Sequence, residues 1–266
     1  MMFFPTSKTI DETNYDCYNN IANEYDDDDH TTCRDFDYCT SAFLNEFFTS
    51  HKIEVNMRYL DIGVGTGKTL ETKINNDKSL IDLLVERNCR IDVLDISDKM
   101  IEIVKNKFHD KINNYIIKSI FKFMPEIKYD IIVAVLCDPY LTDGFLNIAS
   151  KILETSGYLI LTYPSVSWAK QVRGDSNANK MIFNSKNGER YCSFSFCWEE
   201  INLWKRLKKI WLQTKKLNNY FLKELKENRY MSDINNNILS KNNDAGFCIG
   251  IVSRKSTTTG GRYNEN

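Results

Sequence analysis

The chain has 266 residues, with 35 Lys and Arg against 36 Asp and Glu, so its formal net charge is -1 at pH 7. This balance excludes a chain-wide attraction to nucleic acid or to an anionic membrane, which requires a large positive excess. Hydrophobic residues make up 42% of the chain, enough for a sizeable core, and the length fits one large α/β domain. The eight cysteines form no CxxC pair and the three histidines are scattered, which favours a reduced, cytoplasmic protein without a metal site. The longest apolar run, residues 131–137, is too short to cross a membrane.

Charge is concentrated at the two ends of the chain. Residues 1–50 carry eleven acids and two bases, whereas residues 205–255 carry twelve bases and four acids. Both charged segments are interpreted as solvated surface. Two alternatives are that the acidic N-terminal segment folds over the basic C-terminal segment, or that the basic segment binds an acidic partner. We expect a helical acidic lid at 1–50, a main domain at 51–255 and a disordered tail at 256–266, which has no apolar period.

Short apolar runs alternate with amphipathic stretches between residues 57 and 163. Five strands are expected from near-continuous runs of β-branched and other apolar residues, at 58–62, 90–95, 115–118, 130–136 and 158–163. Between them, Ser97 can cap a helix that carries Met100, Ile101 and Val104 on one face. Such alternation predicts a doubly wound, mostly parallel α/β sheet with helices on both faces.

The pattern loosens after residue 163. Asn187-Gly188 between two apolar runs predicts a hairpin, an insertion spanning about 174–197. A helix is expected from 198 to about 209 and a last strand at 246–254. The stretch 204–225 fits one long basic helix or a helix followed by a strand near 210–214, and a seven-stranded sheet favours the second.

The most informative residues follow the first strand, in the string Asp61-Ile62-Gly63-Val64-Gly65-Thr66-Gly67-Lys68-Thr69. A P-loop would need its first glycine at position 62, which is Ile, so the loop is one residue short for a triphosphate. A dinucleotide fingerprint needs its third glycine five residues after the first, and Gly67 follows Gly63 by only four. The spacing that fits is Asp-x-Gly-x-Gly-x-Gly directly after a strand.

With this motif, and with Asp95 at the end of the second strand, the chain resembles the class I S-adenosylmethionine-dependent methyltransferases. The resemblance covers roughly residues 15–163, including Tyr15-Asp16 and the segment 20–26, and 198–254 only in outline. It implies a seven-stranded sheet whose last strand is antiparallel, and S-adenosylmethionine as the cofactor. It also implies cofactor contacts at Tyr25, Asp61, Gly63, Gly65, Gly67, Asp95, Ile96, Ser119, Ile120 and Ala134. Asp95 would accept both ribose hydroxyls, and Tyr25 would lie over the methionine end unless it is simply an exposed helix aromatic.

The chemical step is less clearly marked. Asp138-Pro139-Tyr140 is similar to the Asp/Asn-Pro-Pro-Tyr motif of amino-methyltransferases, which makes Asp138 and Tyr140 the catalytic candidates, although the same residues also suit a strand-ending turn. His30 and residues 26–29 are a further source of a general base. An aromatic-rich stretch from Tyr163 to Trp198 suits either an apolar acceptor pocket or packing of the hairpin.

The resulting hypothesis is O- or N-methylation of a small-molecule acceptor by in-line transfer, without a metal. Two alternatives are a methyltransferase acting on RNA, DNA or protein, for which the basic 205–229 segment is the only support, and a non-catalytic S-adenosylmethionine-binding relative. The acidic N-terminus weighs against nucleic acid as a partner.

Overall fold

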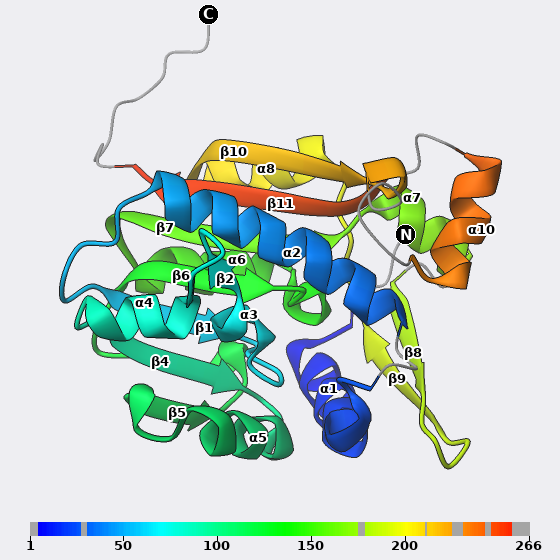
Figure 1. The fold of residues 1–266 in the computed structure, drawn as a ribbon, viewed down its shortest axis with the longest axis horizontal. Coiled ribbons are helices and arrows are strands. Elements are labelled where there is room, and N and C mark those ends of the chain that lie inside the picture. The colour runs from blue at the N-terminus through cyan, green and yellow to red at the C-terminus, as the bar shows by residue number, and fades with distance from the viewer. Residues whose placement is uncertain are drawn as a thin grey trace, which may run out of the picture.

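The computed structural model describes residues 5–27, 31–174, 179–210, 212–224, 231–242 and 246–256. Its centre is a seven-stranded sheet in the order β10-β11-β7-β6-β1-β4-β5 (Figure 1). The strands are β1 (Arg58–Ile62), β4 (Arg90–Asp95), β5 (Asn114–Ile117), β6 (Tyr129–Val135), β7 (Leu153–Pro164), β10 (Leu212–Phe221) and β11 (Gly246–Lys255). All pairs among β5, β4, β1, β6 and β7 are parallel, whereas β11 runs antiparallel to both β7 and β10. The expected doubly wound sheet is therefore confirmed.

Helices cover both faces of this sheet. On one face lie α2 (Thr31–Ser50), α4 (Leu80–Glu86) and α5 (Asp98–Phe108), and on the other lie α6 (Asp143–Ile152) and α8 (Glu200–Lys209). The sheet strands contribute alternate residues to the two cores: Ile131 and Val133 of β6 pack under the first set, and Ile132 and Ala134 under the second. Burial on both faces explains why these strands read as unbroken apolar runs.

The remaining elements are the N-terminal helix and several shorter helices that connect the strands. They are α1 (Ser7–Ile21), η1 (Ala22–Glu24), α3 (Lys68–Glu71), η2 (His109–Lys111), η3 (Ile120–Lys122), η4 (Asp138–Tyr140), α7 (Val166–Arg173) and α10 (Asp233–Lys241). Two small hairpins complete the list, β2–β3 (Lys73–Ile74 and Lys78–Ser79) and β8–β9 (Lys180–Asn184 and Arg190–Phe194). The first hairpin lengthens the connection between Gly67 and Asp95.

Several sequence-based boundaries agree closely with the structure. Ser97 caps α5, its Oγ accepting a hydrogen bond from the Met100 N–H at 3.1 Å, and the expected apolar face of that helix is buried. Gly188, with φ +86°, lies in the β8–β9 turn. After α8 the chain does break into a strand, β10, which is longer than expected because it pairs along nearly the whole of β11. Trp211, Asp28, Asp29, His30 and the tail from 257 lie outside the described residues.

The N-terminal segment differs from the expected lid. Phe43, Leu44 and Phe47 of α2 are at most 1% exposed and belong to the core over the sheet, and Phe43 lies against Gly250 of β11. Helix α2 is thus part of the main domain, because its apolar residues recur at helical spacing and need the sheet to bury them. Only residues 7–27, here called the N-terminal strap, lie across the strand ends. Within the described part of the chain, no helix combines the length and apolar character needed to span a bilayer.

Candidate functional site

The glycine-rich turn connects β1 to α3 at the carboxyl end of the sheet. Gly63, Gly65 and Gly67 have φ angles of +68°, +54° and +87°, a region that side chains other than glycine rarely adopt. The turn is fixed to the neighbouring strand by a hydrogen bond of 2.7 Å from the Gly63 N–H to the Leu94 carbonyl. A Cβ built on Gly65 would meet no atom within 4 Å, so this glycine faces open space.

Asp61 lies beneath this turn with no exposed surface. Neither of its carboxylate oxygens has a hydrogen-bond partner of regular geometry among the described residues, although the nearby Tyr59 hydroxyl favours the ionised form and so opposes a rise in the pKa of Asp61. Burial raises the pKa of Asp61 well above its usual range, and the neighbouring charge of Asp95 raises it further. A buried carboxyl group without a well-placed donor is costly, and a cationic or hydrogen-bond-donating ligand above it would offset that cost.

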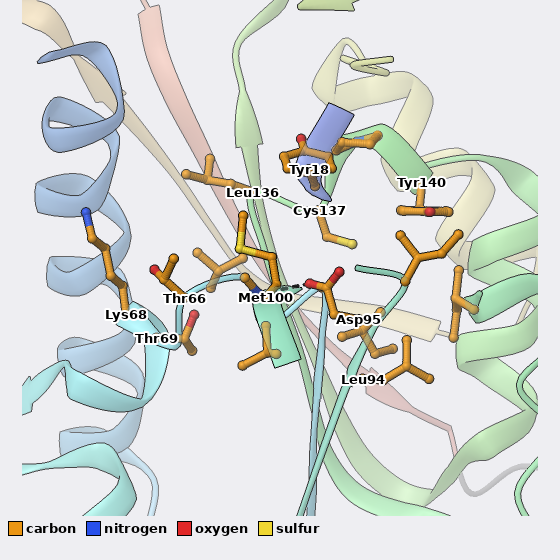
Figure 2. Close-up of a pocket in the computed structure, with 18 of the residues that line it drawn as sticks. Tyr18, Thr66, Lys68, Thr69, Leu94, Asp95, Met100, Leu136, Cys137 and Tyr140 are labelled. Carbon is orange, nitrogen blue, oxygen red and sulfur yellow. Dashed lines mark hydrogen bonds between the residues drawn. The ribbon is translucent and has the colours of Figure 1, made fainter. Parts of the chain in front are cut away.

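Asp95 ends β4 directly beside the turn (Figure 2). Its two oxygens accept hydrogen bonds from the Gly65 N–H at 3.0 Å and from the Ser97 N–H at 2.9 Å. Burial raises the pKa of Asp95, although these backbone donors partly oppose the shift. A carboxylate has about four acceptor positions, and the backbone donors at Gly65, Ser97 and Ile96 leave this one with capacity to accept from a ligand hydroxyl. Asp95 therefore also orients the glycine turn, a role that the sequence did not reveal.

These residues border a pocket, called the first pocket, whose wall is drawn in Figure 2. Of the residues expected at a cofactor site, the pocket is lined by Tyr25, Gly63, Gly65, Asp95, Ile96 and Ile120. Asp61 and Gly67 do not line the pocket. Asp61 lies below it, and Gly67 lies at the start of α3, where a Cβ on this residue would meet the Phe108 ring at 2.6 Å.

Ser119 and Ala134 also lie outside this lining. Ser119 instead caps η3 and donates a hydrogen bond of 2.7 Å to Asp11 of α1. Ala134 is 1% exposed in the core behind the site, one residue before the part of β6 that reaches the pocket. In a strand buried on both faces, periodicity does not tell which residue lies at the end that meets a ligand.

The N-terminal strap closes the pocket from above. Asp26 accepts a hydrogen bond from Thr66 at 2.9 Å and an ion pair from Lys68 at 3.2 Å, and Asn19 donates to Asp98 at 2.7 Å. Through these side chains the strap contacts the glycine turn and the start of α5. Asp26 thus lies at the glycine turn, and a role for it as a general base stays a prediction.

A second pocket adjoins the first and shares Tyr18, Tyr25 and Leu136 with it. Its other walls come from α7, the β8–β9 hairpin and η4, and include Trp168, Arg173, Phe183 and Asp138. The rings of Tyr18, Tyr25 and Phe183 lie 6.0–6.1 Å apart, so they form one aromatic cluster at the meeting point of the two pockets.

Helix η4 separates the two pockets. Pro139 and Tyr140 line the first pocket and Asp138 lines the second, although Asp138 is only 3% exposed. Asp138 accepts a hydrogen bond from the Ser195 hydroxyl. Burial raises the pKa of Asp138 to about 6, against the opposing effects of Arg173 and Ser195. The Tyr140 hydroxyl is buried, and burial raises the pKa of Tyr140.

Sequence reasoning missed several residues that border the pockets. Lys68 bonds Asp37 of α2 at 2.6 Å and so points toward that helix rather than into the pocket. Tyr18, Met100 and Cys137 were missed as pocket residues because each carries an ordinary core or surface pattern, whereas Arg173 lies in the stretch where an acceptor pocket was expected. The one available signal was position, since Cys137 lies two residues after the end of β6 and Met100 lies in the first turn of the helix that follows β4, and ligands bind at the strand ends of open α/β sheets.

Comparison with known proteins agrees with this geometry. Residues 53–228 match the family model described as a methyltransferase domain. A stretch of 74 residues is 42% identical to malonyl-[acyl-carrier protein] O-methyltransferase 2 of Ilyobacter polytropus, which is 27% of this chain and 25% of that protein. The chain thus spans about a quarter of that curated relative's length.

Solved structures share the fold over nearly the whole chain. Magnesium protoporphyrin IX methyltransferase from Synechocystis, with bound S-adenosylhomocysteine, is 11% identical, with a TM-score of 0.60 over 94% of this chain and 100% of that one. An S-adenosylmethionine-dependent methyltransferase from Clostridium acetobutylicum is 16% identical, with a TM-score of 0.58 over 90% and 99%. At these identities the likeness concerns the fold alone.

Proposed function

The chain belongs to the methyltransferase-domain family, and from this premise we propose that it transfers a methyl group from S-adenosylmethionine to a small molecule bound in the second pocket. The observation that carries the proposal is the adjacency of the two pockets, which share Tyr18, Tyr25 and Leu136. Methyl transfer is an in-line displacement, so donor and acceptor must occupy neighbouring sites with a continuous path between them.

The residues of the first pocket fit S-adenosylmethionine. Asp95 has acceptor capacity left for the ribose, and the space in front of Gly65 lets backbone approach the ligand closely. We assign Tyr25, Gly63, Ile96 and Ile120 to the pocket wall, and Asp61 and Gly67 to its support. The unpartnered carboxyl group of Asp61 suits the positively charged methionine end. The cofactor supplies the reactive methyl group, and the chain supplies orientation and exclusion of water.

The composition of the second pocket favours a small acceptor with apolar or aromatic parts. Trp168, Phe183 and Tyr191 line it together with the two shared tyrosines. The strap and the β8–β9 hairpin also cover it, since the Lys186 N–H donates to Glu24 at 2.9 Å and the Lys186 ammonium pairs with Asp27 at 2.7 Å. Two structural relatives are named for small acceptors, magnesium protoporphyrin IX and phosphoethanolamine, whereas the malonyl group in the name of the curated relative is carried on a protein.

A macromolecular acceptor has less support. Much of the described part of the basic stretch that suggested it lies in α8 and β10, and none of the described residues of these two elements lines either pocket.

The test uses tritium-labelled S-adenosylmethionine and an extract of cells that express the chain, separated by ultrafiltration after the reaction. We expect label in the low-mass fraction, dependent on the enzyme. Label confined to protein or nucleic acid would refute a small acceptor, and absence of transfer to any fraction would refute the assigned pocket pair.

A further inference from the structure

The position of Asp138 between the two pockets bears on the acceptor's chemistry. Its neighbours in η4, Pro139 and Tyr140, face the first pocket, whereas its own side chain faces the second. An acceptor atom that reaches the methyl group has to pass the junction formed by Tyr18, Tyr25 and Leu136. Asp138 lines the second pocket together with these three residues, so its carboxyl group faces the same space.

The carboxyl group of Asp138 is held rather than free to turn. Ser195 donates its hydroxyl hydrogen to one oxygen, and Arg173 of α7 is the cation that acts on it. The other titratable groups that interact with Asp138 are Tyr18, Tyr25, Cys33, Cys137, Cys197 and Cys248. Burial raises the pKa of each of these groups, so they are uncharged at neutral pH. Asp138 itself, with a pKa of about 6, is mainly ionised at pH 7 and can still take up a proton.

We propose, on the basis of the function proposed above, that Asp138 is the general base and that the acceptor's reacting group is an N–H or an O–H, an amine or a hydroxyl, rather than a carboxylate. As the acceptor's lone pair forms a bond to the methyl carbon, the carbon–sulfur bond breaks and its electron pair stays on sulfur. The proton of the acceptor passes to the carboxylate of Asp138. Ser195 and Arg173 are positioning residues, because they hold this carboxylate and keep it ionised.

A carboxylate acceptor does not fit this wall. It has no proton to give up at neutral pH, and its negative charge would lie beside that of Asp138 in a buried pocket, where like charges strongly oppose each other. Arg173 and the Ser195 hydroxyl, which could stabilise a second negative charge, already interact with Asp138. The inference therefore separates this chain from a relative named as an O-methyltransferase of malonyl-[acyl-carrier protein].

The experiment identifies the methylated atom and then tests the base. The enzyme is incubated with [methyl-13C]S-adenosylmethionine and the low-mass extract, and the product is assigned by nuclear magnetic resonance. We expect the label on nitrogen or on an ether oxygen. With the identified acceptor, Asp138→Asn should lower kcat about 10²–10⁴-fold and abolish the loss of rate below about pH 6. Asp77→Asn, a matched change in the exposed β2–β3 turn, should leave both unchanged.

Ser195→Ala provides an independent measurement that keeps the test valid if Asp138→Asn folds poorly. Its hydroxyl stabilises the ionised carboxylate, so its loss should raise the pKa of Asp138 and move the acid limb of the rate profile to higher pH. A methyl ester as product would overturn the inference while leaving the proposed function intact. A fully active Asp138→Asn, or an acid limb that Ser195→Ala does not move, would also overturn it.

Discussion

Gly65 and Gly67 offer a matched pair of substitutions that separates the fold from the cofactor site. Both have positive φ angles, +54° and +87°, so alanine at either position costs about 1–2 kcal/mol of backbone strain. At Gly65 the new methyl group would meet nothing within 4 Å, and strain is the whole expected cost. At Gly67 it would lie 2.6 Å from the buried ring of Phe108, which adds about 1–3 kcal/mol of overpacking.

The two variants should therefore fail in different ways. Gly65→Ala should unfold in urea with a loss of about 1–2 kcal/mol but bind S-adenosylmethionine at least tenfold more weakly, because its methyl group occupies ligand space. Gly67→Ala should lose about 2–5 kcal/mol of stability, the sum of both costs. Urea titrations followed by tryptophan fluorescence, and calorimetric titration with S-adenosylmethionine, measure the two quantities. If Gly65→Ala binds within twofold of the wild type, the open space before Gly65 is not where the cofactor lies. Equal stabilities of the two variants would show that the Phe108 contact is unimportant.

Four further outcomes are expected. Asp95→Ala should weaken S-adenosylmethionine binding by about 2–3 kcal/mol in a calorimetric titration, because a charge-assisted pair of hydrogen bonds is lost. A dissociation constant within twofold of the wild type would contradict the assignment. Magnesium-dependent ATP binding should be absent in equilibrium dialysis, because the Lys68 ammonium pairs with Asp26 and Asp37 and the glycine turn is one residue too short for a triphosphate. Micromolar binding that Lys68→Ala abolishes would contradict this prediction. Amide exchange across α1 should slow when S-adenosylmethionine is added, because Tyr18 and Tyr25 of the strap line the first pocket and would gain contacts with the ligand. Unchanged exchange there would contradict the lid hypothesis. Burial raises the folded-state pKa of Asp138 from 3.8 to about 6, so its contribution to stability is present at low pH and is lost as pH rises through 6. Asp138→Asn should therefore gain about 2 kcal/mol relative to the wild type between pH 4 and pH 8 in urea unfolding.

The parts of the fold that were predictable from sequence are those fixed by local pattern. Ser97 followed by Met100 and Val104 determines where α5 begins and which face it buries, and the structure places both as expected. The glycine turn was recognisable because spacing alone excludes two of the three nucleotide loops that it resembles. Asp95 followed from the rule that ligands lie at the carboxyl ends of parallel strands.

Residues whose role depends on distant partners were not predictable. The acidic composition of the first 50 residues suggested that they form one lid. The structure instead packs the apolar side of α2 against the sheet, including β11, and this contact between distant parts of the chain has no local signal in the sequence. Ser195 and Arg173 reach Asp138 through the hairpin and α7, and no spacing in the sequence brings the three together. Long-range polar contacts of this kind carry no local periodic signal.

The contact between Phe43 and Gly250 has a consequence for the synthesis of the protein. A Cβ on Gly250 would lie 2.8 Å from the Phe43 ring, so this helix near the start of the chain needs a strand near its end. At ribosomal rates of about 5–20 residues per second, roughly 10–40 s separate the two residues at the ribosome. During that interval the apolar face of α2 has no sheet edge to cover it, which makes the nascent chain a client for chaperones until β11 emerges. Variants that truncate β11 should therefore aggregate from their N-terminal end.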